Sequence, residues 1–349
     1  MSEIPASELP VIARIEGRAG RLTLNRPKVL HSLNPEMCRI MAEALVDWRD
    51  DPKVEFVLVD HAPGTRGFCA GGDIKLLADS GATDGKEAAD FFRIEYQLNT
   101  LIHNYPKPYV AMIDGVTMGG GVGIAVHGSH RIATENTTFA MPESGIGLFP
   151  DVGGGWFMPR LKNEIGEWLA QTGARLKGKD VLAAGIATHF IEAAKLEDLK
   201  SVSVRDGIRA FDKLETAAEA SFAPHLPVMK ACFEQPTVEA IFAALDNAKD
   251  PWAAKQLADL KTKSPTTLKV AKRQMREGLK ARSFEDNMRM EYRIAARIVR
   301  THDFLEGVRA VIVDKDNAPK WNPATPEGVS EEMLDALFAD LGDQELNFI

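Results

Sequence analysis

The residues best suited to chemistry are two acids, Glu143 and Asp151, which follow two glycine-rich turns at residues 68–73 and 118–123. Glycine lets the backbone approach a ligand closely with its N–H groups unobstructed. Two such turns can direct two N–H donors at one oxygen atom, which is what an oxyanion hole requires. The two acids could then supply acid–base or nucleophilic chemistry beside that oxygen. The combination predicts an acyl-transfer or enolate site.

Each of these features also has a purely structural interpretation. Glycines at helix starts are often steric, Glu143 could cap a helix start, and Asp151 could be a turn residue before the glycines at 153–155. Neither turn matches a nucleotide fingerprint, because residues 119–123 lack the third spaced glycine of a dinucleotide site and no Gly-Lys-Ser/Thr sequence occurs. The presence of both turns together with both acids favours the functional interpretation.

The elements that must position these residues follow an α/β pattern. Alternating runs at 11–15 and 21–25 predict a β-hairpin, and the apolar run at 54–59 is typical of a strand covered on both faces. A further unit of strand, glycine turn, helix and strand follows at 109–134, with one more short strand at 138–141. The recurrence predicts an α/β core of stacked ββα units.

The pattern changes after about residue 205, where strand signals nearly disappear. We therefore predict two parts, a core over 1–205 that holds the active site and a mainly helical region over 206–349. The tail from residue 317 should be extended before one last helix. The helices predicted from apolar spacing in this region are 204–214, 236–245, 251–263, 266–278, 284–299, 304–313 and 330–341.

Composition excludes several classes of protein. A net charge of −8 over 349 residues argues against a general nucleic-acid binder. Cys38, Cys69 and Cys232 are odd in number and widely spaced, so neither a disulfide framework nor a zinc site is predicted. No apolar run reaches the roughly 18 residues that a membrane span needs, and the first twenty residues lack the layout of a targeting peptide. We expect a cytoplasmic protein.

Two longer motifs carry a resemblance to a known family. The runs Phe68-Cys69-Ala70-Gly71-Gly72-Asp73-Ile74 and Gly115-x-x-x-Gly119-Gly120-Gly121 resemble the two signatures of the crotonase (enoyl-CoA hydratase/isomerase) superfamily. Residues 118–161, which include both acids, are most similar to the hydrolases of that superfamily that cleave 3-hydroxyisobutyryl-CoA. The similarity continues through shorter matches at 176–180, 184–189, 264–266 and 302–310.

The resemblance implies a fold and a set of site residues. The fold would be an α/β, crotonase-like spiral of ββα units with a helical C-terminal region. The N–H groups of Gly72 and Gly120 would form the oxyanion hole around a thioester carbonyl. Glu143 and Asp151 would be the two catalytic acids, and Glu95 would contact the substrate. Four further residues match positions along the coenzyme A groove, namely Lys28, Leu30, Ala70 and Lys75.

One departure from the wider superfamily indicates the reaction. Hydratases carry a second catalytic glutamate three residues beyond the oxyanion glycine, where this chain has Gly123, and usually carry glycine where it has Asp151. Hydrolysis is therefore expected, of a short branched 3-hydroxyacyl-CoA thioester and above all of 3-hydroxyisobutyryl-CoA, in valine breakdown.

The resemblance implies no metal or redox cofactor, because coenzyme A is part of the substrate. It implies a small-molecule acyl-CoA as the partner, with neither nucleic acid nor membrane, and is compatible with a homo-oligomer. Two alternatives stay open: an enoyl-CoA hydratase or isomerase of the same fold, and a non-enzymatic binding or assembly protein. Retention of both glycine turns and both acids disfavours the second.

Overall fold

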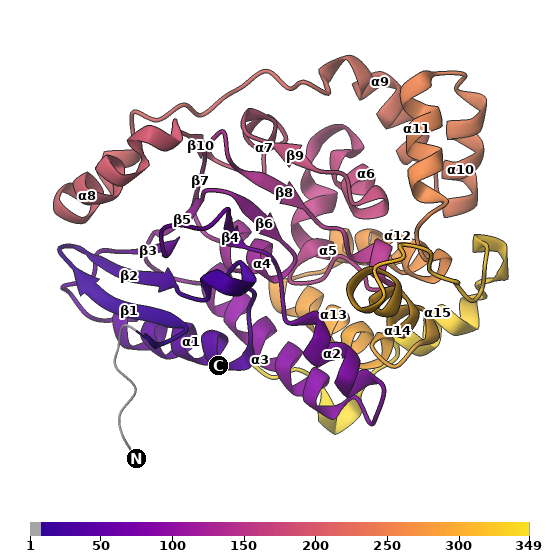
Figure 1. Ribbon diagram of the computed structural model, residues 1–349, viewed down its shortest axis with the longest axis horizontal. Helices are drawn as coiled ribbons and strands as arrows, with labels where there is room; N and C mark the ends of the chain where they lie inside the picture. The colour runs from indigo at the N-terminus through magenta and orange to yellow at the C-terminus, as the bar shows by residue number, and fades with distance from the viewer. Residues whose placement is uncertain (1–7, 349) are drawn as a thin grey trace.

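The computed structural model describes residues 8–348 and contains a six-stranded sheet near one end of the molecule (Figure 1). The first two strands form an antiparallel hairpin, as the alternating runs predicted, and every later strand pairs in parallel. In spatial order the strands are β1 (Val11–Glu16), β2 (Ala19–Leu24), β3 (Phe56–His61), β5 (Tyr109–Ile113), β7 (His130–Ala133) and β10 (His189–Phe190).

Both faces of this sheet are covered, which explains the continuous apolar runs. Alternate residues of a strand point to opposite faces. On β3, Val57 and Val59 join the main core with α1 (Pro35–Arg49) and α3 (Lys86–His103). Phe56 and Leu58 instead pack with residues of α8 (Leu196–Asp206) in a second buried cluster.

A second, four-stranded sheet carries the motifs that the sequence singled out. Its order is β4 (Gly67–Cys69), β6 (Val116–Met118), β8 (Thr138–Ala140) and β9 (Leu176–Lys177). The first three strands are mutually parallel, so their carboxyl ends meet at one edge of the sheet. Directly after those ends come Ala70–Gly72, Gly119–Gly120 and Pro142–Glu143. This topology brings both glycine turns and the first acid together.

Short helices follow the turns of the core. They are α2 (Ile74–Gly81), α4 (Gly120–Val126), α5 (Gly154–Phe157), α6 (Ile165–Thr172) and α7 (Lys179–Ala183). Asp73 caps α2 by accepting a hydrogen bond from the Leu76 N–H.

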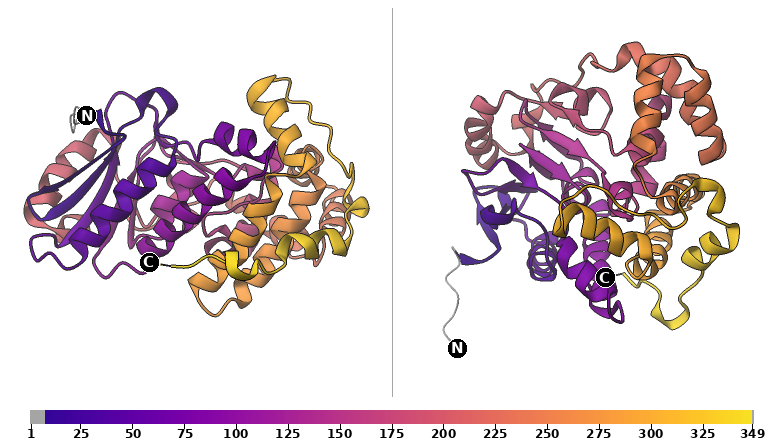
Figure 2. Two further views of the ribbon diagram at one scale, coloured as in Figure 1. Left: turned by 90° about the horizontal axis from the view of Figure 1, so that it is seen from below. Right: turned by 45° about the vertical axis from the view of Figure 1, so that its right-hand side comes forward.

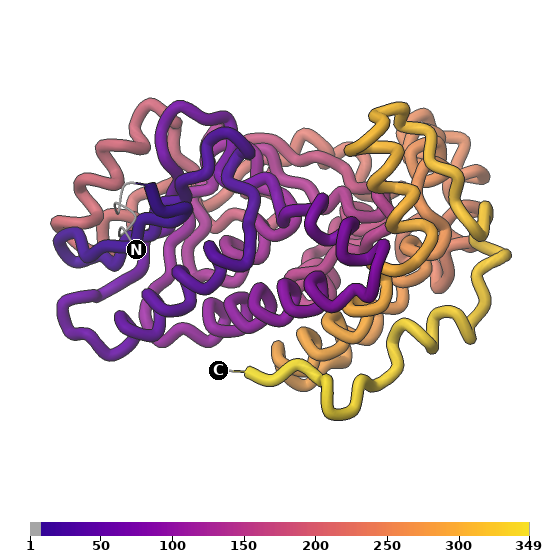
Figure 3. The backbone as a smooth tube through the Cα atoms, turned by 60° about the horizontal axis from the view of Figure 1, so that its bottom comes forward, coloured from indigo at the N-terminus to yellow at the C-terminus, as the bar shows by residue number. Residues whose placement is uncertain are grey.

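The later part of the described chain is helical and packs against the core (Figure 2). Residues of α12 and α13 belong to the same buried cluster as α1, α3 and the glycine turns. The end of the chain returns to α3, where Arg93 and Gln97 donate hydrogen bonds to backbone oxygens of residues 345 and 347 (Figure 3). The helices are α9 (Leu226–Phe233), α10 (Val238–Asn247), α11 (Pro251–Leu260), α12 (Pro265–Lys280), α13 (Phe284–Ile298), α14 (His302–Val308) and α15 (Glu331–Phe338).

Most elements predicted from apolar spacing are confirmed, and one is wrong. The helix predicted at 204–214 is instead the end of α8, followed by a short 3₁₀ turn at Ile208–Phe211. Gly207, with a φ of 78°, ends α8 because that backbone conformation cannot continue a right-handed helix. Helices α2, α5, α6, α7 and α9 and the short strands β4, β6, β9 and β10 were not predicted. The division at residue 205 falls inside α8, and that division stays a prediction.

Candidate active site

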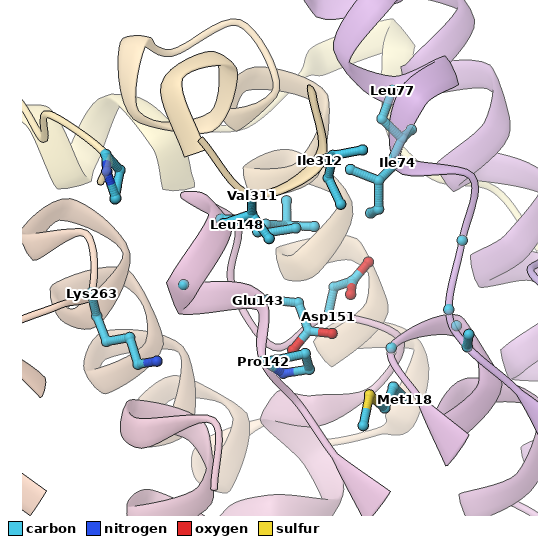
Figure 4. A pocket seen from close by; sticks show the side chains of 18 of the residues that line it. Ile74, Leu77, Met118, Pro142, Glu143, Leu148, Asp151, Lys263, Val311 and Ile312 are labelled. Atoms are coloured by element: carbon cyan, nitrogen blue, oxygen red, sulfur yellow. The ribbon is translucent and has the colours of Figure 1, made fainter. Parts of the chain in front are cut away.

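The glycine turns and acids line one cavity of about 590 Å³. Gly72 and Gly120 contribute backbone, while Glu95, Glu143 and Asp151 contribute carboxyl groups. In Figure 4, Glu143 and Asp151 lie next to each other in this cavity. The structure therefore brings together all five residues that the sequence assigned to thioester chemistry.

The two glycine turns approach each other at the cavity wall. A β-carbon built on Gly120 would lie 3.3 Å from the Gly72 nitrogen and would collide with a carboxyl oxygen of Glu95. Only glycine fits at this position without displacing its neighbours. Within residues 8–348, neither the Gly72 nor the Gly120 N–H donates a hydrogen bond, so both donors are available to a ligand.

Glu143 enters the cavity because it follows the end of β8 by three residues. The residue begins a short 3₁₀ helix, Glu143–Ile146, and is 5% exposed. Its Oε2 atom has no hydrogen-bond partner among the described residues. Its other oxygen faces the second turn, since a β-carbon on Gly119 would lie 3.0 Å from Oε1. Burial, and then the neighbouring charges of Asp151 and Glu95, raise the pKa of Glu143 well above its usual value.

Asp151 has a partner that the sequence did not reveal. The Tyr96 hydroxyl donates a 2.8 Å hydrogen bond to Asp151 Oδ2, and both side chains are buried. Burial raises the pKa of Asp151 to about 7, while the Tyr96 donor opposes that rise by stabilising the carboxylate. The sequence signal was slight: Tyr96 directly follows Glu95, but only the packing of α3 against the Asp151 loop makes it part of the site.

Glu95 is the third acid of the cavity and is almost completely buried. Its Oε1 atom has no hydrogen-bond partner among residues 8–348. Burial, and then the charge of Asp151, raise the pKa of Glu95 well above its usual value. Three neighbouring carboxyl groups repel one another when ionised, so the cavity favours keeping protons on some of them at neutral pH.

Only some of the residues predicted to bind coenzyme A lie at or beside this cavity. Ala70 lines the cavity, and its N–H donates a 3.0 Å hydrogen bond to the Leu30 carbonyl, which places Leu30 beside it. Lys28 and Lys75 do not line the cavity. Lys75 is exposed and pairs with Asp79 at 2.6 Å, and Lys28 lies in the exposed turn Pro27–Val29. The assignment of these four residues to coenzyme A stays a prediction.

The helical C-terminal region completes the wall of the cavity. Val311 and Ile312, which follow α14, lie above the two acids in the view of Figure 4, near Leu148. Lys263, which directly precedes the N-cap of α12, lines another part of the wall. The sequence identified none of these residues as part of the site, because no local motif marks them.

Comparisons with known proteins identify the family of this chain. The model of the enoyl-CoA hydratase/isomerase family matches residues 19–338. The chain belongs to this family. Two solved structures of similar sequence confirm the crotonase fold with its helical C-terminal region. One, from Mycobacterium thermoresistibile, is described as a carnitinyl-CoA dehydratase, with a TM-score of 0.93, 40% identity and coverage of 97% of this chain and 98% of that one. The other, from Rhodobacter sphaeroides, is described as an enoyl-CoA hydratase, with a TM-score of 0.90, 39% identity and coverage of 97% and 100%.

Curated relatives in the family carry a different activity in their names. The 3-hydroxyisobutyryl-CoA hydrolase of Gallus gallus is 45% identical over 97% of this chain and 91% of the relative. The human enzyme of the same name is 43% identical, over 97% and 90%. Both are named as mitochondrial, so the cytoplasmic location expected for this chain stays a prediction. Among residues 8–348, every helix is too short or too polar to cross a membrane.

The residues around Gly123 help to decide whether the site is better suited to hydration or to hydrolysis. The resemblance described above matches this position to the second catalytic glutamate of hydratases. A β-carbon on Gly123 would lie 2.7 Å from the Val152 β-carbon and 2.8 Å from Asn99 Nδ2. No side chain can be placed there without moving the loop that carries Asp151. Packing as well as residue type therefore opposes a two-glutamate hydratase site.

Proposed function

We propose that this family member hydrolyses 3-hydroxyisobutyryl-CoA, or a closely similar short branched 3-hydroxyacyl-CoA, to the free acid and coenzyme A. The observation that carries the proposal is that the buried acids Glu143 and Asp151 line the same cavity. Val152 also leaves no space at Gly123 for the second glutamate of a hydratase. The names of the curated relatives support the same substrate. This reaction would belong to valine breakdown.

The backbone donors would act on the thioester carbonyl. The unoccupied N–H groups of Gly72 and Gly120 would stabilise the negative charge that develops on its oxygen, an effect worth roughly 3–4 kcal/mol per donor. Because these donors belong to the backbone of two fixed turns, they would need little rearrangement during the reaction.

Glu143 would act as the nucleophile or base, and Asp151 would act as the proton donor. An ionised Glu143 would attack the carbonyl carbon and form an anhydride, which water then cleaves; alternatively it would take a proton from the attacking water. Asp151 would give its proton to the departing thiolate; burial raises the pKa of both acids, which supports a proton held by the pair at neutral pH. One proton shared by two neighbouring carboxyl groups supplies both a base and an acid at neutral pH.

Glu95 and the apolar wall would select the acyl group. A protonated Glu95 would hydrogen-bond to the 3-hydroxyl group through Oε1, which has no partner among the described residues. The side chains of Ile74, Leu148 and Val311 would contact the branched carbon chain. None of these steps requires a metal or redox cofactor.

A thiol-release assay across a panel of acyl-CoA thioesters tests the proposal, with Glu143→Gln as the decisive variant. We expect release from 3-hydroxyisobutyryl-CoA and a loss of at least about 1,000-fold in Glu143→Gln. Glu167→Gln is the matched control, because Glu167 is equally buried but pairs with Gln171 outside the cavity. Hydration of crotonyl-CoA without thiol release would instead favour the enoyl-CoA hydratase alternative.

A further inference from the structure

The loop that carries Asp151 has an unusual backbone. Val152 has a φ of 50° and Gly153 a φ of 90°, so two consecutive residues adopt left-handed conformations. For a β-branched residue such as valine this conformation is unfavourable, and it persists only where neighbouring groups hold it. The contacts that hold this loop therefore decide where the Asp151 side chain lies.

A single carboxylate from the C-terminal region accepts two hydrogen bonds from this loop, whose Val152 carbonyl also lies 2.7 Å from His127 Nε2 in the core. Glu291, on α13, accepts a 2.7 Å hydrogen bond from the Gly153 N–H at Oε2. Its Oε1 atom accepts a 2.8 Å bond from the Gly155 N–H. The side-chain amides of Gln274 and Asn287 each donate a further bond of 2.9 Å to Oε1. Gln274 also donates to the Pro150 carbonyl at 2.7 Å, so the network holds both sides of Asp151.

The hydrogen bonds of this network favour an ionised Glu291. The side chain is fully buried and forms no salt bridge among residues 8–348. Burial raises the pKa of Glu291 to about 7, and the donated hydrogen bonds oppose the rise. All four of its partners are donors, and a carboxylate, whose two oxygens only accept, matches all of them without a competing proton.

We propose that Glu291 is a positioning residue for Asp151. It holds the left-handed turn at Val152 and Gly153 so that Asp151 meets the Tyr96 hydroxyl at 2.8 Å. Glu291 lies 138 residues after Gly153 in the sequence. Through this contact, the helical C-terminal region sets the geometry of an acid in the core. Its catalytic consequence rests on the function proposed above.

Glu291→Gln tests the proposal with little change in volume. The amide keeps one oxygen acceptor but directs an NH₂ group at the other glycine N–H, so one anchor of the loop is lost. We expect kcat for thiol release to fall between about 10-fold and 100-fold, because small displacements of a reacting group are costly. KM for the thioester should change by less than about twofold, since Gly72 and Gly120 lie on other elements.

Glu167→Gln is the matched control. Glu167 is also buried with a pKa raised by burial to about 7, and it accepts a 2.9 Å hydrogen bond from Gln171, but it touches no part of the Asp151 loop. A general loss of stability should appear in both variants, whereas a fall in kcat at constant KM should appear only in Glu291→Gln. Normal kcat in folded Glu291→Gln, or an equal loss of kcat and substrate affinity, would overturn the proposal.

Amide hydrogen exchange separates this inference from the proposed reaction. The Gly153 and Gly155 amides should exchange at least about 10-fold faster in Glu291→Gln and at the wild-type rate in Glu167→Gln. Unchanged protection would overturn the positioning role even if the enzyme hydrolyses the expected thioester. Faster exchange in a protein that releases no thiol would leave the positioning role standing and refute the proposed function. If Glu291→Gln does not fold, Gln274→Leu replaces it and should lower kcat in the same direction.

Discussion

Replacing Tyr96 by phenylalanine should raise the pKa of Asp151 and shift the pH dependence of the reaction. The substitution removes one hydroxyl group, whose hydrogen bond to Asp151 Oδ2 is 2.8 Å long. The ring itself is packed against Phe92 and Tyr292, at centroid distances of 5.6 and 6.4 Å, and phenylalanine keeps both contacts. The change therefore acts on the acid and leaves the packing in place.

The magnitude follows from the environment of the bond. A hydrogen bond to a charged group contributes about 1.5–3 kcal/mol, and one pKa unit corresponds to about 1.4 kcal/mol. The Tyr96 donor stabilises the ionised form of Asp151, so its loss destabilises the carboxylate and moves the pKa upward. Starting from about 7, the pKa of Asp151 should rise by roughly one to two units in Tyr96→Phe.

The assay is the pH profile of kcat for thiol release, measured from about pH 5 to about pH 10 in wild type and variant. The limb that reports Asp151 should move to higher pH. Tyr292→Phe is the matched control, because the Tyr292 hydroxyl accepts a 2.7 Å hydrogen bond from Arg93 and does not touch Asp151. A limb that stays in place or moves to lower pH would refute the reasoning, as would an equal shift in Tyr292→Phe.

Two further predictions concern packing and charge. Gly123→Ala should lower the free energy of unfolding by about 1–3 kcal/mol in urea titrations, and lower kcat, because the new methyl group would displace Val152 next to Asp151. Asp60→Asn should lower the free energy of unfolding by about 3–5 kcal/mol at neutral pH. The substitution breaks a buried cluster in which Arg21 and Lys200 contact Asp60 at 2.5 and 3.2 Å. Although burial opposes ionisation, these two cations hold the pKa of Asp60 below its usual value. The stability that ionised Asp60 contributes to the fold is therefore present above the pKa of Asp60 in the unfolded chain, and it is lost as the pH falls through the pKa in the folded protein. The free energy of unfolding should therefore depend less on acid pH in Asp60→Asn than in the wild type.

The sequence by itself determined most strands of the six-stranded sheet and both glycine turns, but not the short strands β4 and β6 that precede those turns. The apolar run at 109–113 coincides with β5, and the glycine turns stand where β4 and β6 end. These predictions succeeded because they depend on local information: side-chain alternation along a strand and the backbone freedom of glycine. Gly72, Gly120 and Glu143 were identifiable because each lies in a short motif shortly after a strand, and Asp151 because it lies in the glycine-rich run 150–155.

Local patterns failed where one residue altered the backbone. The apolar spacing across residues 204–214 suggested a continuous helix, but Gly207 adopts a φ of 78° and ends α8. A glycine within an apolar pattern does not by itself reveal whether the helix continues, because the backbone conformation depends on what packs around it.

Only the tertiary structure decided which partners the proposed catalytic acids have. Tyr96 and Asp151 are hydrogen-bonded although they lie 55 residues apart in the sequence, and Glu291 accepts a hydrogen bond from Gly153, 138 residues before it. Neither residue belongs to a motif, and each acquires its role from the packing of α3 and α13 against the Asp151 loop. The raised pKa values of the three acids likewise arise from burial in a shared cavity. Residue types and spacing identify the reactive groups, whereas their desolvation and hydrogen bonding depend on contacts between distant segments that form only when the chain has folded.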